Sequence, residues 1–216
     1  MARLEAGLAK TSRNNRTMFR PCWATNQPTT EVTRETLVRT ARQLFADRGY
    51  AAVGTEEVVQ RAGRTRGALY HHFRDKRDLF RAVYEQAEAE VVESIRAGAS
   101  TATDAYDQLV AGIHLFLDAC TNPALMRIGL LDGPSVLGWA ECRDIAAPSA
   151  LGLLTVALQG GMDAAVLRRS DVKPLAHLLL GALGEAGMLI ANADDPNAAR
   201  RDVERAVLEL IDGLRI

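Results

Sequence analysis

The sequence predicts an all-α protein, and two observations support this prediction. Alanine and leucine, which favour helices, are abundant, whereas aromatic residues make up only 5% of the chain. No run of alternating β-branched residues is long enough to predict a strand. Across the 216 residues, 48% hydrophobic and 25% charged residues are typical of a soluble globular protein with one or two small domains.

The first predicted helix covers residues 30–48. Apolar side chains recur there at the three- and four-residue spacing of one helix face: Val38, Ala41, Leu44 and Phe45. Gly49 follows, and glycine readily adopts the left-handed conformation that ends a helix. We expect the apolar face of this helix to cover the two short helices that come next.

These two short helices are separated by a glycine turn. Thr55 is expected to start the first, because its hydroxyl can cap free backbone N–H groups, and Gly63 ends it. Thr65 starts the second. The apolar side of the second helix consists of Ala68, Leu69 and Phe73. A short helix, a tight turn and another short helix form the helix-turn-helix pattern.

The outward side of the second short helix combines hydrogen-bond donors with small residues. It presents Arg64, Thr65, Arg66, Gly67, Tyr70, His71 and His72. No carboxylate lies between Arg64 and Arg74. Arginine can bind guanine edges or phosphates through two N–H groups, and hydroxyls suit phosphates. We therefore interpret this face as DNA-binding, although most charged runs are only solvated surfaces.

A long helix is predicted to start at Lys76, with Asp75 as its cap. Its apolar stripe comprises Leu79, Phe80, Val83, Ala87, Val91 and Ile95. At a helix N-terminus, backbone N–H groups and a cation together suit a phosphate, so Lys76 is a candidate contact. The full set of candidate DNA contacts is Thr55, Arg64, Thr65, Arg66, Gly67, Tyr70, His71 and Lys76.

Residues 30–84 resemble the DNA-binding domain of the TetR family of bacterial transcriptional regulators. The matching residues are Phe45, Gly49, Tyr50, Thr55, Val58, Ala62, Gly63, residues 65–73, Lys76, Leu79 and Phe80. Arg64 departs from the family, which usually has a small apolar residue there, and its charge either contacts DNA or splays outward. The resemblance implies a ligand-responsive repressor that binds a pseudo-palindromic operator as a homodimer.

Charge is divided unevenly along the chain. Residues 1–83 contain 16 Lys or Arg and 8 Asp or Glu, a net charge of +8, whereas residues 84–216 have a net charge of −9. A basic head on an acidic body suits a polyanion-binding protein. We expect a DNA-binding domain at residues 30–83 and a helical ligand-sensing and dimerisation domain at residues 84–216.

The basic tail, residues 1–29, lacks sustained periodicity, and we expect it to be disordered. An arm that follows the DNA backbone or enters a minor groove is the alternative interpretation. A wrongly assigned start codon is a third.

Further helices are predicted after a break at residues 98–103. They cover residues 107–120, a segment that starts at Asn122 and Pro123, residues 147–159, residues 175–190 and residues 197–214. Asp132, Gly133 and Pro134 are expected to turn the chain. The segment 175–190 is shorter than a membrane span and contains His177 and Glu185, so we expect a cytoplasmic protein without membrane contact.

The segments 147–159 and 175–190 are apolar on nearly every side. A helix of this kind must be buried all round, and one small domain can hardly cover both. We therefore expect a second copy of the chain to cover them, although a loose core helix or a glycine-rich loop is the alternative. The candidate interface residues are Leu151, Leu154, Leu158, Leu179, Leu183, Ala186 and Gly187.

The sequence contains no catalytic or metal-binding motif, so neither an enzyme nor a cofactor is expected. Cys22, Cys120 and Cys142 are widely spaced and expected to be reduced thiols. The family resemblance implies a cavity for an unknown small-molecule effector. Its candidate lining residues are His114, Phe116, Cys120, Met126, Arg127, Leu130, Trp139, Met162 and His177, any of which could instead be ordinary core. A non-sensing structural DNA binder and a small all-α enzyme are the competing classes.

Overall fold

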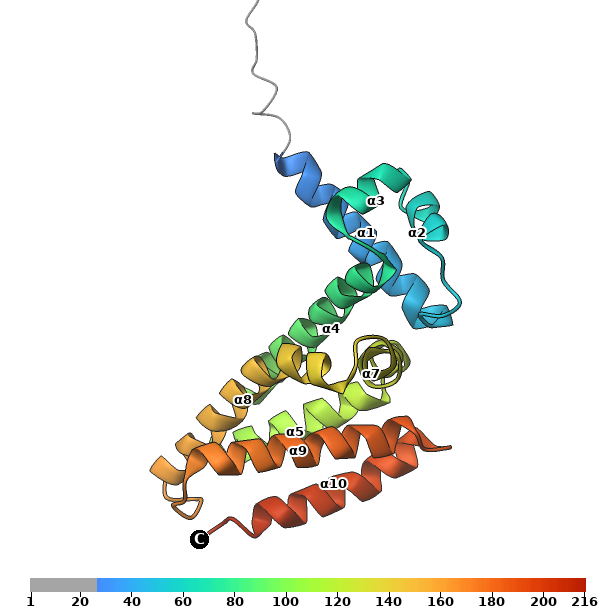
Figure 1. Cartoon of the computed structure of the whole chain (residues 1–216). Coiled ribbons are helices and arrows are strands. Elements are labelled where there is room, and N and C mark those ends of the chain that lie inside the picture. Colours follow the sequence, from blue (N-terminus) through green and yellow to red (C-terminus); the bar gives the residue numbers. More distant parts are fainter. Residues whose placement is uncertain (1–26) are drawn as a thin grey trace, which may run out of the picture.

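The computed structural model describes residues 27–216, and every regular element in this range is a helix (Figure 1). The elements are α1 (Gln27–Arg48), α2 (Thr55–Arg61), α3 (Arg66–His72), α4 (Lys76–Ala99), α5 (Ala105–Thr121), α6 (Pro123–Leu125), the π-helix η1 (Met126–Asp132), α7 (Gly133–Val136), α8 (Trp139–Asp163), α9 (Val172–Ala191) and α10 (Pro196–Asp212). The all-α prediction is confirmed. Residues 1–26 of the predicted tail lie outside the described range, and α1 begins three residues earlier than expected.

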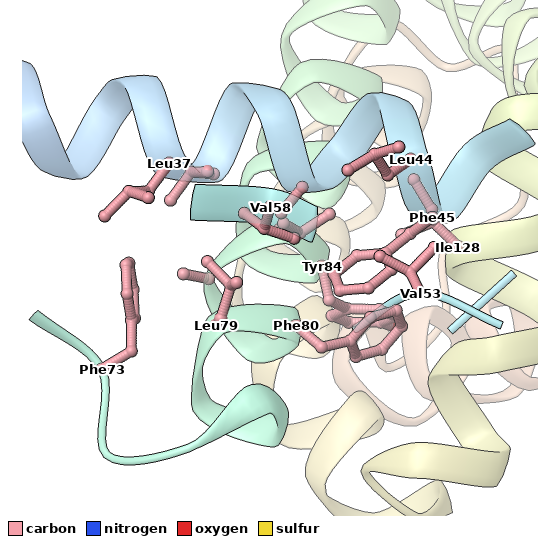
Figure 2. Packing of buried hydrophobic residues seen from close by; sticks show 14 of the residues in the cluster. Leu37, Leu44, Phe45, Val53, Val58, Phe73, Leu79, Phe80, Tyr84 and Ile128 are labelled. Carbon is pink, nitrogen blue, oxygen red and sulfur yellow. The ribbon is translucent and has the colours of Figure 1, made fainter. Parts of the chain in front are cut away.

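Helices α1, α2 and α3 form a head at one end of the molecule, and α4 runs from this head into the body (Figure 1). The head has an aromatic centre in which the rings of Phe45 and Phe80 lie 5.5 Å apart and those of Tyr50 and Phe80 lie 5.2 Å apart. Figure 2 shows Ile128 of η1 in the same buried cluster as Phe45 and Phe80. Because Ile128 is fully buried there, the head and the body share one continuous core.

The chain turns of the head follow the predicted signals with one exception. Gly49 and Gly63 adopt positive φ angles of 79° and 61° after α1 and α2. The hydroxyl of Thr65 accepts a hydrogen bond from the Ala68 amide at 3.2 Å and caps α3. Thr55 does not cap α2 as predicted, because it is the first helical residue and Gly54 occupies the cap position without a side chain.

The body consists of α5, α8, α9 and α10 around a second core (Figure 1). Between α5 and α8 the chain follows α6, η1 and α7 without the turn that we predicted at residues 132–134. Pro134 is tolerated because it lies in the first turn of α7, where its missing N–H needs no partner. The chain leaves this helical run at Gly138, whose φ angle is 85°.

The two apolar helices are longer than predicted, since α8 has 25 residues and α9 has 20. Pro148, which we expected to precede a helix, lies inside α8. By length and composition alone, both helices could cross a membrane, so the prediction that the second is too short for a span is wrong. What covers these helices must therefore be inferred from the residues on their surfaces.

Most of the predicted interface residues face the core of their own chain, so their side chains offer little surface to a partner. Leu158, Leu179, Leu183, Ala186 and Gly187 are buried, and Leu183 is only 6% exposed. Leu151 and Leu154 are half-buried against the same core. The exposed large apolar residues of α8 and α9 are instead Trp139 (57%), Val156 (74%), Leu178 (73%) and Leu189 (54%). A helix that is apolar all round gives no sequence signal for which side its own chain covers.

Candidate DNA interface and effector cavity

Helix α3 is fixed to the head by one side and exposed on the other. Leu69 is fully buried against the head core, which turns the opposite side of this short helix to solvent. The predicted contacts Arg64, Thr65, Arg66, Gly67, Tyr70 and His71 are all exposed. Thr55 is half-buried in the first turn of α2. The fold therefore brings six of the eight candidate residues together in one accessible segment.

Arg66 already has partners on the surface of the head. Its guanidinium lies 3.0 Å from a carboxylate oxygen of Glu56 on α2 and 5.5 Å from the centre of the Tyr70 ring. Both side chains of the ion pair are about two-thirds exposed, at 68% and 66%. Exposed pairs of this kind contribute little, so a phosphate or a base edge can replace Glu56. The sequence analysis did not identify Glu56 as a neighbour of the recognition helix.

Lys76 lies further from solvent than we predicted. Its ammonium donates a hydrogen bond to the Tyr50 carbonyl at 2.6 Å and lies 4.0 Å from the centre of the Tyr50 ring. Burial lowers the pKa of Lys76, and the nearby Asp132 carboxylate opposes this effect. A phosphate contact would require this ammonium to leave the Tyr50 carbonyl, so the contact stays a prediction.

Two polar joints connect the head and α4 to the segment between α5 and α8. At the first, the Tyr50 amide donates a hydrogen bond to the Asp132 carboxylate of η1 at 2.7 Å. At the second, the Arg77 guanidinium donates to the carbonyls of Val136 and Leu137 at 3.2 and 3.1 Å and also pairs with Glu141. The position of the head thus depends on η1, α7 and the start of α8.

A cavity of about 170 Å³ lies in the body, bounded by α4, α5, η1, α7, α8 and α9. Of the predicted ligand-binding residues, Phe116, Leu130 and Trp139 line it, as does Met188. The remaining lining residues that carry a polar or aromatic group were not among the predicted ones. They are Tyr84, Glu88, Cys142 and Arg143.

The other predicted ligand-binding residues are not among those that line this cavity. Met162 and Cys120 are buried in the second core, and burial raises the pKa of the Cys120 thiol to about 12. The imidazole of His114 lies 2.9 Å from Glu204 of α10. His177 and Arg127 are exposed, and Met126 is half-buried in η1. Apolar composition alone does not distinguish a cavity wall from a packed core.

Glu88 is the carboxylate among the cavity residues that the sequence analysis missed. Burial raises the pKa of its carboxyl, and a hydrogen bond from the Tyr84 hydroxyl partly opposes this effect. The same hydroxyl also contacts the Cys142 thiol. Phe80, Tyr84 and Glu88 follow one another at four-residue spacing on α4, so they share a face of the helix. The position of Glu88 on the same helix face as Phe80 and Tyr84, which the sequence shows by their spacing, could have indicated this site.

Both the N-terminal and the C-terminal part of the chain match a known protein family. Residues 37–83 match the family described as "Bacterial regulatory proteins, tetR family". Residues 106–214 match "Tetracyclin repressor-like, C-terminal domain". The chain belongs to the TetR family. This result confirms the resemblance that the helix-turn-helix residues indicated. Most residues that line the cavity fall within the C-terminal match, whereas Tyr84 and Glu88 lie between the two matched ranges.

Similarity to individual proteins and to a solved structure agrees with this family assignment. It is 28% identical to the Escherichia coli TetC protein of transposon Tn10 over 149 residues, which cover 69% of this chain and 75% of TetC. It is 36% identical to the transcriptional activator FasR of Mycolicibacterium smegmatis over 85 residues, 39% of each chain. A TetR-family regulator from Pectobacterium atrosepticum has a crystal structure with a TM-score of 0.80, 34% identity, and coverage of 88% of this chain and 97% of that one. The protein is therefore a DNA-binding transcriptional regulator and not an enzyme.

Proposed function

We propose that this TetR-family protein is a ligand-responsive repressor that binds a pseudo-palindromic operator as a homodimer. The observation that carries the proposal is the course of α4. This helix starts at Lys76, shortly after the exposed helix α3, which is the proposed recognition helix. It carries Tyr84 and Glu88 to the wall of the cavity. The proposed division assigns residues 30–83 to DNA binding and residues 84–216 to ligand sensing and dimerisation.

The proposed dimer interface is the uncovered side of α8 and α9. Val156, Leu178 and Leu189 supply its apolar contacts. The same helices also expose polar residues, among them His177 and Glu185. Such groups are costly in lipid, which favours a second protein chain over a membrane. We accordingly place the protein in the cytoplasm, where TetR-family regulators normally act.

Dimerisation supplies selectivity that one head lacks. A single short recognition helix contacts only a few base pairs, whereas two helices on a rigid scaffold can read two half-sites about 34–36 Å apart. We assign base contacts to Thr65, Arg66 and Gly67, and phosphate contacts to Tyr70 and Lys76. Thr55, Arg64 and His71 lie at the edge of this surface and complete the proposed set.

The π-helix η1 is the proposed connection between the cavity and the head. Gly129 and Leu130 of η1 line the cavity, and Asp132 at its end holds the Tyr50 amide. A π-helical turn is less regular than an α-helix and often occurs at functional sites, so η1 is suited to change shape. A ligand that prefers a shifted η1 would change the position of the head and release the operator.

Footprinting tests the proposed function. The purified protein should protect a palindrome in the DNA upstream of its own coding sequence, with equal protection of the two half-sites. Repression is then checked by placing that DNA before a reporter gene, with and without the protein. Protection without sequence preference would contradict the proposal and indicate a structural DNA binder.

Arg66→Ala should weaken operator binding by about 1–3 kcal/mol and relax the preference at one base pair in each half-site, because a bidentate contact to a base is lost. Binding measured on a set of operators with single substitutions checks this. Arg96→Ala is the matched control, since it removes the same charge from an exposed position at the far end of α4. Equal weakening on all sequences would make Arg66 a backbone contact.

Lys76→Ala should weaken binding to operator and random DNA alike. It should also reduce the slope of log affinity against log salt concentration by about one unit, because one phosphate contact is lost. Urea unfolding of the variant separates this effect from the loss of the hydrogen bond to the Tyr50 carbonyl. A slope equal to that of the native protein would exclude Lys76 from the phosphate contacts.

A further inference from the structure

We propose that the effector is a small organic cation, with an apolar body and an ammonium group that binds Glu88. This inference rests on the proposed ligand-responsive function and names the chemical class of the ligand. It follows from three features of the cavity: a carboxylate that pairs with no cation among residues 27–216, three aromatic rings in the walls, and an acidic groove at its side.

The Glu88 carboxylate lies at the cavity wall with little around it to balance its charge. A methyl group built on Gly129 would stand 3.7 Å from its Oε1 atom, so the main chain of η1 passes close beside it. The Tyr84 hydroxyl is its hydrogen-bond donor. Within residues 27–216, no ion pair within 4.0 Å involves Glu88. Glu88 is half-buried, so part of the hydration of its charge is lost, and a cation beside it would compensate for that loss.

The cavity walls suit the rest of such a ligand. Tyr84, Phe116 and Trp139 contribute aromatic rings, and Leu130, Leu180 and Met188 contribute apolar surface. The faces of aromatic rings attract cations, and they do so most strongly when water is excluded. An ammonium group at Glu88 with its apolar substituent toward the aromatic rings would therefore satisfy both parts of the cavity.

Arg143 also lines the cavity and is the competing charge. Its side chain is exposed to solvent, in contrast to Glu88, so water already stabilises its charge. An anionic ligand would gain less from Arg143 than a cation gains from Glu88, because the larger electrostatic energies occur where water is excluded. The cation is thus the favoured ligand, and an anion is the alternative that an experiment must exclude.

A surface groove of about 510 Å³ between α4 and α8 borders Glu88 on its other side. Its charged lining residues are Arg81, Glu85, Glu88, Glu141 and Asp144, four carboxylates against one guanidinium. Arg81 pairs with both Glu85 and Glu141, at 3.3 and 3.1 Å. The negative potential of this groove would raise the local concentration of cations near Glu88.

The proposal predicts a specific pH dependence. Burial raises the pKa of Glu88, so this carboxyl takes up a proton at higher pH than an exposed glutamate does. A cation prefers the ionised carboxylate, and its affinity should therefore fall as the pH is lowered through the raised pKa. The titratable or charged groups near Glu88 lie on three helices: Arg81, Tyr84 and Glu85 on α4, Cys120 on α5, and Glu141, Cys142, Arg143 and Asp144 on α8. Burial raises the pKa of both thiols and of Tyr84, so these groups stay neutral in this range.

Calorimetric titration of the full-length protein with three probes of similar size tests the proposal. The probes are 2-phenylethylammonium, 2-phenylethanol and 3-phenylpropionate, which differ in charge. The cation should bind about tenfold more tightly than the alcohol, and lowering the pH should remove this preference. Glu88→Gln should abolish the preference, whereas Glu85→Gln, at a partly exposed groove position, should retain it. If Glu88→Gln does not fold, the proposal is still tested by the native protein, through its preference for the cationic probe and the pH dependence of that preference.

Three results would overturn the inference: equal affinity for the three probes, preference for the carboxylate, or no binding of the cation up to about 10 mM. Operator binding is measured on the same samples by fluorescence anisotropy. Sequence-specific DNA binding together with any of these three results would reject the cationic ligand and leave the proposed DNA-binding function in place. Loss of sequence-specific DNA binding in the native protein would instead reject the proposed function.

Discussion

Replacing Leu178 with Glu is expected to give a folded monomer that no longer binds its operator. Leu178 is 73% exposed on α9, and Leu189, about three helical turns further along, lies on the same side of this helix. A glutamate there is harmless in the isolated chain, but in a dimer it would place an unpartnered charge in an apolar interface. Sedimentation velocity measures the oligomeric state, and circular dichroism checks the helical content. A variant that stays dimeric and binds the operator normally would refute this interface.

Leu183→Glu is the matched control for this experiment, because it makes the same substitution on the same helix five residues further along. Leu183 is packed inside the second core of its own chain. A carboxylate at this position would be buried without a partner at a cost of several kcal/mol, so the protein should lose its fold and not only its dimer. The contrast between the two variants distinguishes an interface position from a core position, which neither variant could do alone.

Asp132→Ala should loosen the head from the body. The variant leaves the partly buried Tyr50 amide without its acceptor, which should lower the free energy of unfolding by about 1–3 kcal/mol. Amide hydrogen exchange at Tyr50 should become faster, and urea unfolding measures the stability. If the proposed connection through η1 holds, the effector should also change operator affinity by less than it does in the native protein.

Two further variants make the Asp132 experiment specific. Asp163→Ala removes an exposed carboxylate at the end of α8, which accepts a hydrogen bond from Gln159 of the same helix. Because Asp163 is far along the chain from η1, this variant should leave the amide exchange rate of Tyr50 unchanged. Asp132→Asn keeps an acceptor oxygen. Its rate of amide exchange at Tyr50 and its free energy of unfolding should therefore lie between those of Asp132→Ala and the native protein. Unaltered protection of the Tyr50 amide in Asp132→Ala would show that Asp132 does not hold the head.

Local signals allowed the DNA-binding head to be predicted almost residue by residue. Gly49 and Gly63 end helices by a backbone conformation that glycine adopts readily, and Thr65 and Asp75 cap helices with their own side chains. Each of these signals acts within four residues, so the sequence contains all of the information. The exception is Thr55, because a hydroxyl can occupy either the cap position or the first helical turn.

The body was harder to predict because its features depend on contacts between distant segments. Leu178 and Leu183 are the same residue type on the same apolar helix, yet only Leu183 is covered by the chain itself. Gly133 and Pro134 resemble a turn, but proline is equally compatible with the first turn of α7. Glu88 belongs to the cavity only because η1 and α8 come to lie beside α4.

In the polar contacts that join the head, α4 and the body, one of the two partners is usually a main-chain group. Asp132 and Lys76 bind the amide and the carbonyl of Tyr50, and Arg77 binds the carbonyls of Val136 and Leu137. Every residue has a backbone carbonyl, and every residue except proline has a backbone N–H. These contacts therefore do not require a particular side chain at those positions. A head from a relative that has the same turn at position 49, and that keeps the side chains packed against Ile128, could therefore be grafted onto this body. Chimeric regulators with a new operator and the original effector response should be obtainable from this fold.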